Sequence, residues 1–457
     1  MLPTRTTIIL LAVAALGLLL LGRGALPAQA PPAVAPPPAA PPSPYTAPDW
    51  HAVLAGTDPL RLLVVGHKAM LAWKGDADVR VSYAATDADV YTAHAGEQVG
   101  VVRTPEGGCA LRQEGKNFLT VTEAFRLTSP KPILLWTPQP ETWRIVHGPV
   151  VITPLADNTF GIAQELLLED YLRNVVCGEM PASFHAQALR AQAIIARTYT
   201  LAKLGRHADE GADLCDEVHC QVYGADANRS RATDEAVADT RGLVLMYGDT
   251  LAEAYYHATC GGVTDDAGLV WGPEYARPYL VGGTKDSAVK ESAAIGDILC
   301  ASGGYCKRSN GYRWTRVFSA TEVNELVSRN LTKVTGDPAA KMSKVVNMNV
   351  EERTPNGRVA RLRVEGDGAS YVVIGDQARW LFGTGDPGPE GLWSTLFDLT
   401  VTRDARGAIT QYTFKGAGRG HGIGMCQWGA DGRARAGQSY REILAAYYPG
   451  TKVVTGK

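Results

Sequence analysis

The stretch Leu168-Glu169-Asp170-Tyr171-Leu172, which continues to Glu179-Met180-Pro181, decides the fold of the chain. Its apolar residues, such as Leu172 and Val175, recur at the three- or four-residue spacing of an amphipathic helix. Pro181 predicts the end of this helix, because proline lacks a backbone N–H and clashes with the preceding turn. The sequence therefore predicts a helix that ends at a glutamate beside a proline.

The segments that flank this helix predict the fold class. A second, alanine-rich helix is expected from an N-cap at Ser183 to about Lys203. Before the helices, from Leu60 to about Leu135, short apolar stretches alternate with turns. A second strand-rich stretch runs from Val345 to Thr402, and the tail from Tyr440 to Tyr447 predicts a short helix. Because helices and strands occupy separate stretches, we expect an α+β fold.

The N-terminus has the pattern of a targeting segment. An apolar run ends at Ala28-Gln29-Ala30, which is typical of a secretory signal peptide. An uncleaved membrane anchor is the alternative, and both place the rest of the chain outside the cytoplasm, in the periplasm or cell wall. We expect residues 1–30 to be a signal peptide or anchor, 31–48 a proline-rich linker, 49–140 a small β-rich domain and 141–457 a second domain.

Composition excludes several functional classes. The chain has 457 residues, a formal net charge of −2 and 45% hydrophobic residues, which is ordinary globular composition. Without a basic excess, nucleic acid is not an expected partner, and a membrane would be contacted only through an uncleaved N-terminus. Eight cysteines in a chain of this length are too few for a disulfide scaffold.

Glu179 is a candidate catalytic acid. It lies between two expected helices, where its carboxylate could point into a groove. An apolar neighbour such as Met180 could raise the pKa of the carboxyl group, as a general acid near neutral pH requires. The alternative is a surface glutamate at a helix end.

Histidine and cysteine residues between 207 and 220 form a candidate metal site. Two thiolates and two imidazoles, from Cys215, Cys220, His207 and His219, would satisfy tetrahedral zinc. In an oxidising compartment Cys215 and Cys220 could instead form a disulfide bond, or both could be free thiols. The spacing leaves all three alternatives open.

Two further segments contain candidate binding residues. A strand-like run would deliver Tyr256 and His257 to the mouth of a site, or would simply enter a glycine turn. The glycine-rich segment 416–430 does not complete a nucleotide-binding motif. Its imidazole and amide, His421 and Gln427, suit sugar hydroxyl groups, although a tight turn is the plainer reading.

Taken in order, these segments resemble the SpoIID/LytB family (stage II sporulation protein D and relatives) from about Trp143 to Lys452. The motifs that carry the resemblance are Leu168-Glu169-Asp170-Tyr171-Leu172, Glu179-Met180-Pro181, Ala191-Gln192-Ala193, Ala196-Arg197-Thr198-Tyr199, Cys220-Gln221-Val222-Tyr223, Tyr256-His257, Cys260-Gly261-Gly262, Gly420-His421-Gly422-Ile423-Gly424-Met425 and Tyr447-Tyr448-Pro449-Gly450-Thr451.

The resemblance implies a SpoIID-like catalytic domain over 141–457 and a peptidoglycan lytic transglycosylase that acts on glycan strands stripped of stem peptides. The catalytic glutamate of the family falls on Glu179, which would act first as acid and then as base to leave a 1,6-anhydro end. No cofactor is required. The resemblance also suggests residues for sugar binding or charge stabilisation: Gln192, Arg197, Tyr256, His257, His421 and Gln427.

The resemblance further implies a structural zinc, because some members bind zinc through residues that map onto His207, Cys215, His219 and Cys220. Cys260 and Cys426 both lie in motifs that should approach the site, which suggests a disulfide bond between them. Two other functions stay open. The chain could be a non-catalytic cell-wall module that enhances an amidase, or a structural envelope protein with residues 60–135 as a docking domain.

Overall fold

The computed structural model describes residues 45–105, 107–138, 141–224, 228–283, 294–383 and 391–456. The expected signal peptide or anchor, 1–30, and most of the linker, 31–48, lie outside the described residues. Within the described ranges, no helix combines the length and the apolar composition that a membrane span requires. Helices and strands both occur throughout, so the α+β class is confirmed.

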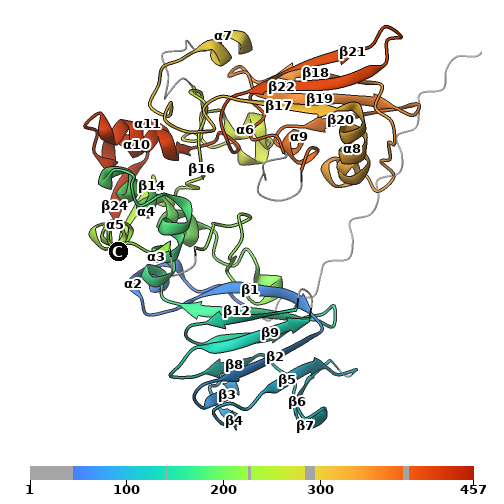
Figure 1. Cartoon of the computed structure of the whole chain (residues 1–457). Coiled ribbons are helices and arrows are strands. Elements are labelled where there is room, and N and C mark those ends of the chain that lie inside the picture. The colour runs from blue at the N-terminus through green and yellow to red at the C-terminus, as the bar shows by residue number, and fades with distance from the viewer. Residues whose placement is uncertain are drawn as a thin grey trace, which may run out of the picture. The chain divides into compact units, whose positions relative to one another are not determined.

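The β-rich region consists of two sheets that share one apolar core, and their strands are antiparallel except for β13 (Figure 1). In spatial order, the first sheet contains β13 (Leu214–Cys215), β1 (Leu60–Lys68), β12 (Phe160–Leu166), β11 (Val150–Pro154), β8 (Phe125–Thr128), β3 (Val79–Tyr83) and β4 (Asp89–Ala93). The second contains β10 (Glu141–Val146), β9 (Ile133–Pro138), β2 (Met70–Gly75), β5 (Val99–Arg103), β6 (Cys109–Gln113) and β7 (Lys116–Val121). Trp73 and Phe125, one from each sheet, are completely buried in the core between them.

The β-rich region extends past residue 140, where the sequence suggested a domain boundary. Strands β10, β11 and β12 follow that residue, yet β10 pairs with β9, and β12 pairs with β1. The sheet therefore continues to Leu166, one residue before the cap of the first long helix. The short strand β13 joins the same sheet in parallel with β1, which carries Cys215 to its edge.

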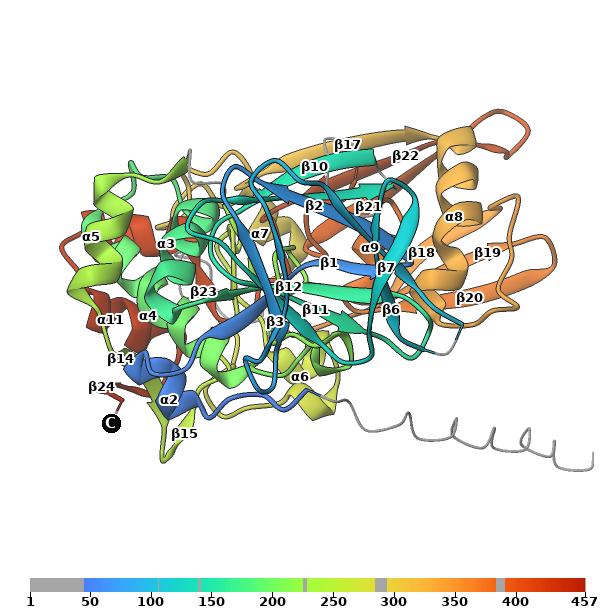
Figure 2. The same cartoon turned by 90° about the horizontal axis from the view of Figure 1, so that it is seen from below.

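The helical region is built around one buried helix, α4 (Ala186–Ala202). From Ala188 to Leu201 every α4 residue except Arg190 is buried, and small side chains let neighbouring helices pack closely. Figures 1 and 2 show its neighbours around it. They are α3 (Leu168–Glu179), α5 (Arg231–Asp239), α10 (Gln427–Arg435) and α11 (Tyr440–Tyr447). The predicted tail helix is confirmed, whereas the α4 N-cap is His185 rather than Ser183.

Another apolar core lies in the C-terminal half. It is formed by two sheets, β17 (Trp314–Ser319), β22 (Ile409–Gly416) and β21 (Phe397–Arg403) in one, and β18 (Asn347–Arg353), β19 (Val359–Gly366) and β20 (Ala369–Ile374) in the other, with helices α8 (Ala320–Thr335) and α9 (Gln377–Trp380). The strand-rich stretch expected from 345 to 402 is confirmed.

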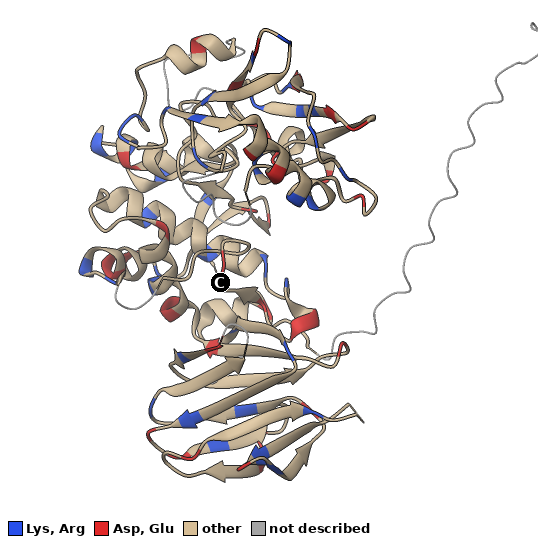
Figure 3. Ribbon diagram, turned by 45° about the vertical axis from the view of Figure 1, so that its right-hand side comes forward, with Lys and Arg blue, Asp and Glu red and all other residues tan. Residues whose placement is uncertain are grey.

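Short elements connect these layers and carry the candidate site. They are α2 (Trp50–Ala55), η1 (Ala208–Glu210), β14 (Leu243–Tyr247), β15 (Thr250–Leu251), β16 (Tyr256–His257), α6 (Ala267–Val270), η3 (Pro273–Tyr275), α7 (Ile295–Cys300), β23 (Met425–Cys426) and β24 (Lys452–Thr455). Figure 3 shows basic and acidic residues interspersed along the described elements, in keeping with the balanced net charge.

Candidate functional site

Glu179 lies at the centre of a hydrogen-bond network contributed by three distant segments. It is the last residue of α3 and is half-buried. Its Oε1 accepts hydrogen bonds from the Val222 backbone N–H at 2.8 Å and from the Tyr256 hydroxyl at 3.1 Å. Its Oε2 accepts one from Gln427 Nε2 at 3.1 Å. Both carboxylate oxygens are therefore held in place, and Tyr256 and Gln427 are brought together with Glu179.

The Val222 donor reaches Glu179 because two glycines let a loop lie directly against α3. A Cβ on Gly178 would stand 2.8 Å from the Gly224 nitrogen and 2.8 Å from the Val222 oxygen, closer than real Cβ contacts. The Gly224 N–H also donates to the Asn174 carbonyl at 2.9 Å. This contact fixes the loop on the last turn of the helix.

The other two donors are joined by a short parallel pairing. Strand β16 pairs with β23, so that Tyr256 lies opposite Met425 and His257 opposite Cys426. Gln427 follows as the first residue of α10, with the Trp428 N–H donating to the Ala258 carbonyl at 3.1 Å. The pairing holds together the two segments that carry Tyr256 and Gln427 to Glu179.

Tyr256 links Glu179 to a buried glutamine that the sequence did not single out as a site residue. The Tyr256 hydroxyl also lies 3.0 Å from Gln221 Oε1. Gln221 is only 1% exposed, and its Nε2 donates to Tyr171 and Thr200. Burial, and next the charge of Glu179, raise the pKa of Tyr256 well above its usual value, so the hydroxyl keeps its hydrogen.

The imidazoles of His257 and His421 form hydrogen bonds with backbone atoms of the protein. His421 Nε2 donates to the Tyr256 carbonyl at 2.8 Å, and its Nδ1 accepts from the Ile423 N–H at 3.1 Å. His257 is 4% exposed, and its Nδ1 lies 3.1 Å from the Ile423 carbonyl. Burial lowers the pKa of His421 to about 4 and that of His257 well below its usual value, so both rings are neutral near pH 7.

Arg197 and Gln192 were expected to bind sugar, but both side chains are buried. The Arg197 guanidinium is 0% exposed and forms a bidentate pair with Glu169, with both distances at 2.9 Å. It also donates to the carbonyls of Leu243 and Val237. Gln192 is 0% exposed inside α4, and neither end of its amide has a hydrogen-bond partner among the described residues. In this structure both side chains lie inside the protein, where a glycan cannot contact them.

The four candidate zinc ligands do lie together. His207, Cys215, His219 and Cys220 each offer a ligand atom, and these atoms lie within 4.8 Å of one another. Cys220 Sγ is 3.4 Å from His207 Nε2, and Cys215 Sγ is 3.7 Å from His219 Nδ1. Two thiols and two imidazoles at these distances fit tetrahedral zinc.

Neighbouring side chains favour metal binding by His207 and oppose metal binding by His219. Glu210 accepts from His207 Nδ1, which leaves the lone pair on Nε2 directed at the cluster. His219 Nε2, in contrast, accepts from Arg206, so ligation through Nδ1 would require Arg206 to turn away. Contact with Cys220 and His207 lowers the pKa of the Cys215 thiol, and contact with Cys215 raises that of Cys220. The lowered pKa of Cys215 favours its thiolate, the form that binds metals.

The cysteine pairings expected as disulfides are not formed. No disulfide bond joins any of the eight cysteines, all of which lie in the described part of the chain. Cys260 and Cys426 are close, with the Cys260 N–H 3.2 Å from Cys426 Sγ, as the family motifs suggested. A third thiol, Cys306, lies 3.7 Å from Cys260 Sγ, so Cys260 and Cys426 belong to a cluster of three cysteines rather than to an isolated pair.

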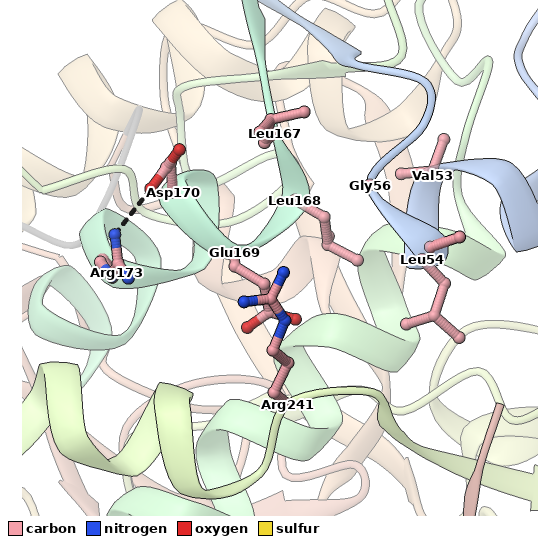
Figure 4. A pocket seen from close by; sticks show the side chains of 10 residues that line it. Val53, Leu54, Gly56, Leu167, Leu168, Glu169, Asp170, Arg173 and Arg241 are labelled. Atoms are coloured by element: carbon pink, nitrogen blue, oxygen red, sulfur yellow. Dashed lines mark hydrogen bonds and ion pairs between the residues drawn. The ribbon is translucent and has the colours of Figure 1, made fainter.

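A separate pocket lies beside α2 and the start of α3 (Figure 4). Its volume is about 210 Å³, and its lining includes Glu169, Arg241 and the Asp170–Arg173 ion pair. Glu179 does not line it. This pocket adjoins the Glu169–Arg197 pair and is distinct from the Glu179 network.

Residues 156–247 match the family model described as stage II sporulation protein (SpoIID). Residues 276–424 match a model of a domain of unknown function, DUF8618. The "Stage II sporulation protein D" of Bacillus subtilis is 28% identical over 305 residues, which are 64% of this chain and 75% of that protein. The chain therefore contains a SpoIID domain over residues 156–247.

Two other proteins are also similar to this chain. An "Amidase enhancer" of Bacillus subtilis is 30% identical over 300 residues, and the aligned part spans 40% of that protein's length and 62% of this chain. An uncharacterized protein of Brachyspira hyodysenteriae is 28% identical over 317 residues, or 67% of this chain and 72% of the relative. The SpoIID match contains Glu179 and the 207–220 cluster, whereas Tyr256 and Gln427 follow it in the chain.

Proposed function

We propose that this protein is a lytic transglycosylase that cleaves peptidoglycan glycan strands outside the cytoplasm, with Glu179 as its acid and base. The observation that carries the proposal is the convergence of Val222, Tyr256 and Gln427 on a single half-buried carboxylate at a helix end. A carboxylate held at both oxygens can present its proton in one fixed direction.

The network around Glu179 can accommodate both protonation states that the reaction needs. The Tyr256 hydroxyl has one hydrogen and two acceptors within 3.1 Å, Glu179 Oε1 and Gln221 Oε1. When Glu179 is ionised, Tyr256 donates to it. When Glu179 is protonated, the Tyr256 hydroxyl can turn and donate to Gln221 instead, and the carboxyl hydrogen is left for the glycosidic oxygen.

The reaction needs only this one acid. Protonated Glu179 gives its proton to the glycosidic oxygen between N-acetylmuramic acid and N-acetylglucosamine, and the C1–O bond breaks. The ionised carboxylate then takes the proton of the muramic C6 hydroxyl, whose oxygen bonds to C1 of the same ring. Glu179 ends protonated, and the product is a 1,6-anhydro sugar. The intramolecular nucleophile removes the need for the second carboxylate of ordinary glycosidases.

A structural zinc at His207, Cys215, His219 and Cys220 would support this site from one side. Cys220 directly precedes Gln221 and Val222, which both belong to the Glu179 network. A bound zinc would supply a rigid cross-link between the sheet edge at Cys215 and this loop, and takes no part in the proton transfers. The chain's own residues still provide every donor to Glu179.

The direct test is mass spectrometry of peptide-free glycan after incubation with purified protein. The wild type should release 1,6-anhydro products, and Glu179→Gln should lower the rate by about 10²–10⁴-fold, the usual contribution of a general acid–base. Glu325→Gln, which changes an exposed glutamate on α8, is the matched control and should retain full activity. A fully active Glu179→Gln protein would contradict the proposal.

The second candidate is a non-catalytic enhancer of a peptidoglycan amidase. The observation that favours it is the similarity to the "Amidase enhancer", which reaches 30% identity. In that case the protein alone should release no anhydro products. It should still accelerate an amidase on intact peptidoglycan, and Glu179→Gln should do so as well as the wild type.

A further inference from the structure

A second cluster of cysteine and histidine residues is buried beside the Glu179 network. Cys260, Cys306 and Cys426 are each 0% exposed, and His257 is 4% exposed. They come from three segments: β16 with the turn after it, the loop after α7, and β23. The cluster is separate from the one formed by residues 207–220.

The distances in the cluster suit a metal better than a disulfide bond. Ligand atoms of His257, Cys260 and Cys426 lie within 4.8 Å of one another. Cys306 Sγ lies 3.7 Å from Cys260 Sγ, and the Cys306 thiol also interacts with Cys426. Two sulfurs on a tetrahedral zinc, each about 2.3 Å from the metal, stand about 3.8 Å apart, whereas a disulfide bond is about 2.05 Å long.

Backbone donors surround two of the sulfurs. Cys426 Sγ accepts from the N–H groups of Cys260 and Gly429, each at 3.2 Å. Cys260 Sγ accepts from the Gly262 N–H at 3.3 Å. Such donors stabilise negative charge on sulfur and orient it, as the hydrogen bonds around metal ligands do.

His257 offers the nitrogen lone pair that completes the set. Its Nδ1 lies against the Ile423 carbonyl, which can only accept, so Nδ1 carries the hydrogen and Nε2 has the lone pair. Nε2 is buried and has no hydrogen-bond partner among the described residues. A buried acceptor without a hydrogen bond is destabilising, and a metal ion bound to Nε2 would remove this destabilisation.

A buried cation lies close enough to balance the charge of three thiolates. Arg358 is 1% exposed and donates to the carbonyl of Cys260 at 3.3 Å. Its ion-pair partner Asp265 stands 3.9 Å away, a long distance for a fully buried pair. A zinc ion with three thiolates and a neutral imidazole carries one negative charge, which Arg358 would offset.

We propose that His257, Cys260, Cys306 and Cys426 bind a structural zinc ion. Soft thiolate ligands in a tetrahedral set select zinc over magnesium and calcium. The site would join the loop after α7 to β16 and β23. His257 directly follows Tyr256, and Cys426 directly precedes Gln427, so this metal would fix the two segments whose side chains donate to Glu179.

The test measures zinc per chain in the full-length protein purified under reducing conditions. Cys306→Ser should lower the zinc content by one ion per chain relative to the wild type. Cys300→Ser, an exposed cysteine six positions earlier in the chain, is the matched control and should leave it unchanged. Because metal content is read without any glycan, the outcome is independent of the proposed transglycosylase activity.

A second measurement on the wild type keeps the test valid if Cys306→Ser does not fold. The protein is denatured with a chelator but no reductant, and its thiols are alkylated and mapped. Alkylation of Cys260, Cys306 and Cys426 together with release of two zinc ions per chain, one more than the 207–220 cluster can hold, supports the site. An intact mass lower by two hydrogens, with two of these cysteines linked, overturns it, as does equal zinc content in Cys306→Ser and the wild type.

Discussion

Arg197 is a charged residue whose role is structural, because its surroundings pair it with Glu169. A family motif made it a candidate for sugar binding, but its guanidinium is buried against Glu169 and two backbone carbonyls. This pairing crosses from α4 to the first turn of α3. The residue therefore holds in place the helix that ends at Glu179.

Loss of the Arg197 pair should therefore lower stability rather than substrate binding. Arg197→Met leaves Glu169 without its partner, and breaking a buried pair costs about 3–5 kcal/mol. Arg190→Met on the same helix is the matched control, because its pair with Asp239 is 30% and 46% exposed and should contribute about 0–1 kcal/mol. Urea unfolding measures both; equal effects would contradict the structural role.

Tyr256→Phe should weaken both the network and the reaction. The change removes a donor to Glu179 and leaves the buried Gln221 Oε1 without the hydroxyl. We expect activity to fall about 10- to 100-fold, the worth of a hydrogen bond to a charged group, and stability to fall by about 1–3 kcal/mol. Tyr275→Phe, at an exposed tyrosine, is the control. Glycan turnover and thermal unfolding measure the two effects, and unchanged turnover would exclude Tyr256 from the mechanism.

At the residue level, the sequence identified side chains that have a chemical signature but not the backbone around them. Glu179, Tyr256 and Gln427 were candidates and do meet. The Val222 donor was missed because a backbone N–H belongs to every residue. Gln221 was quoted within a family motif, yet nothing in its type indicated a buried acceptor for Tyr256.

At the level of the elements, α3 depends on a glycine where its last turn meets the loop after Cys220. The sequence predicted α3 and its end at Pro181, because apolar periodicity and proline are local signals. It missed the close approach of residues 222–224, since contacts between distant segments leave no local pattern.

The variant Gly178→Ala tests whether the contact between α3 and the loop matters more than the helix propensity of residue 178. Alanine favours a helix over glycine by about 1 kcal/mol, but here its Cβ would press on backbone atoms of Val222 and Gly224 at 2.8 Å. We expect the loop to shift and activity to fall about tenfold or more, because small misplacements near a reacting group are costly. Gly296→Ala on α7, whose Cβ would meet nothing within 4 Å, should be neutral or slightly stabilising. Thermal unfolding and glycan turnover compare the two; wild-type activity in Gly178→Ala would refute the role of the loop.

At the scale of the whole molecule, the β-rich region and the helices share an apolar cluster, in addition to the core between the two sheets. Val53, Leu60 and Leu62 pack into the same cluster as α3 and α4 side chains. Strand β1 lies between β12 and β13, so it is paired on both edges with strands from later in the chain. The sequence placed a boundary at 140 because such long-range pairing cannot be read from periodicity.

A chain that lacks residues 45–146 should therefore fail to fold. The deletion uncovers the edges of β12 and β13, and each buried leucine or valine that it removes from the shared core contributes about 1.5–3 kcal/mol. A few such losses approach the usual total stability of about 5–15 kcal/mol. Removal of residues 1–42 is the control and should leave folding intact. Circular dichroism and thermal unfolding give the answer; a cooperatively folded 147–457 fragment would contradict the shared core.

The parallel pairing of β16 with β23 has a consequence for how relatives of this protein can differ. These two strands bracket the region that matches DUF8618, and they hydrogen-bond to each other. Everything between them leaves from and returns to one fixed junction. Relatives can therefore differ in the length of the chain between these strands while Tyr256 and Gln427 stay in place, provided that the loop with Cys306 is kept.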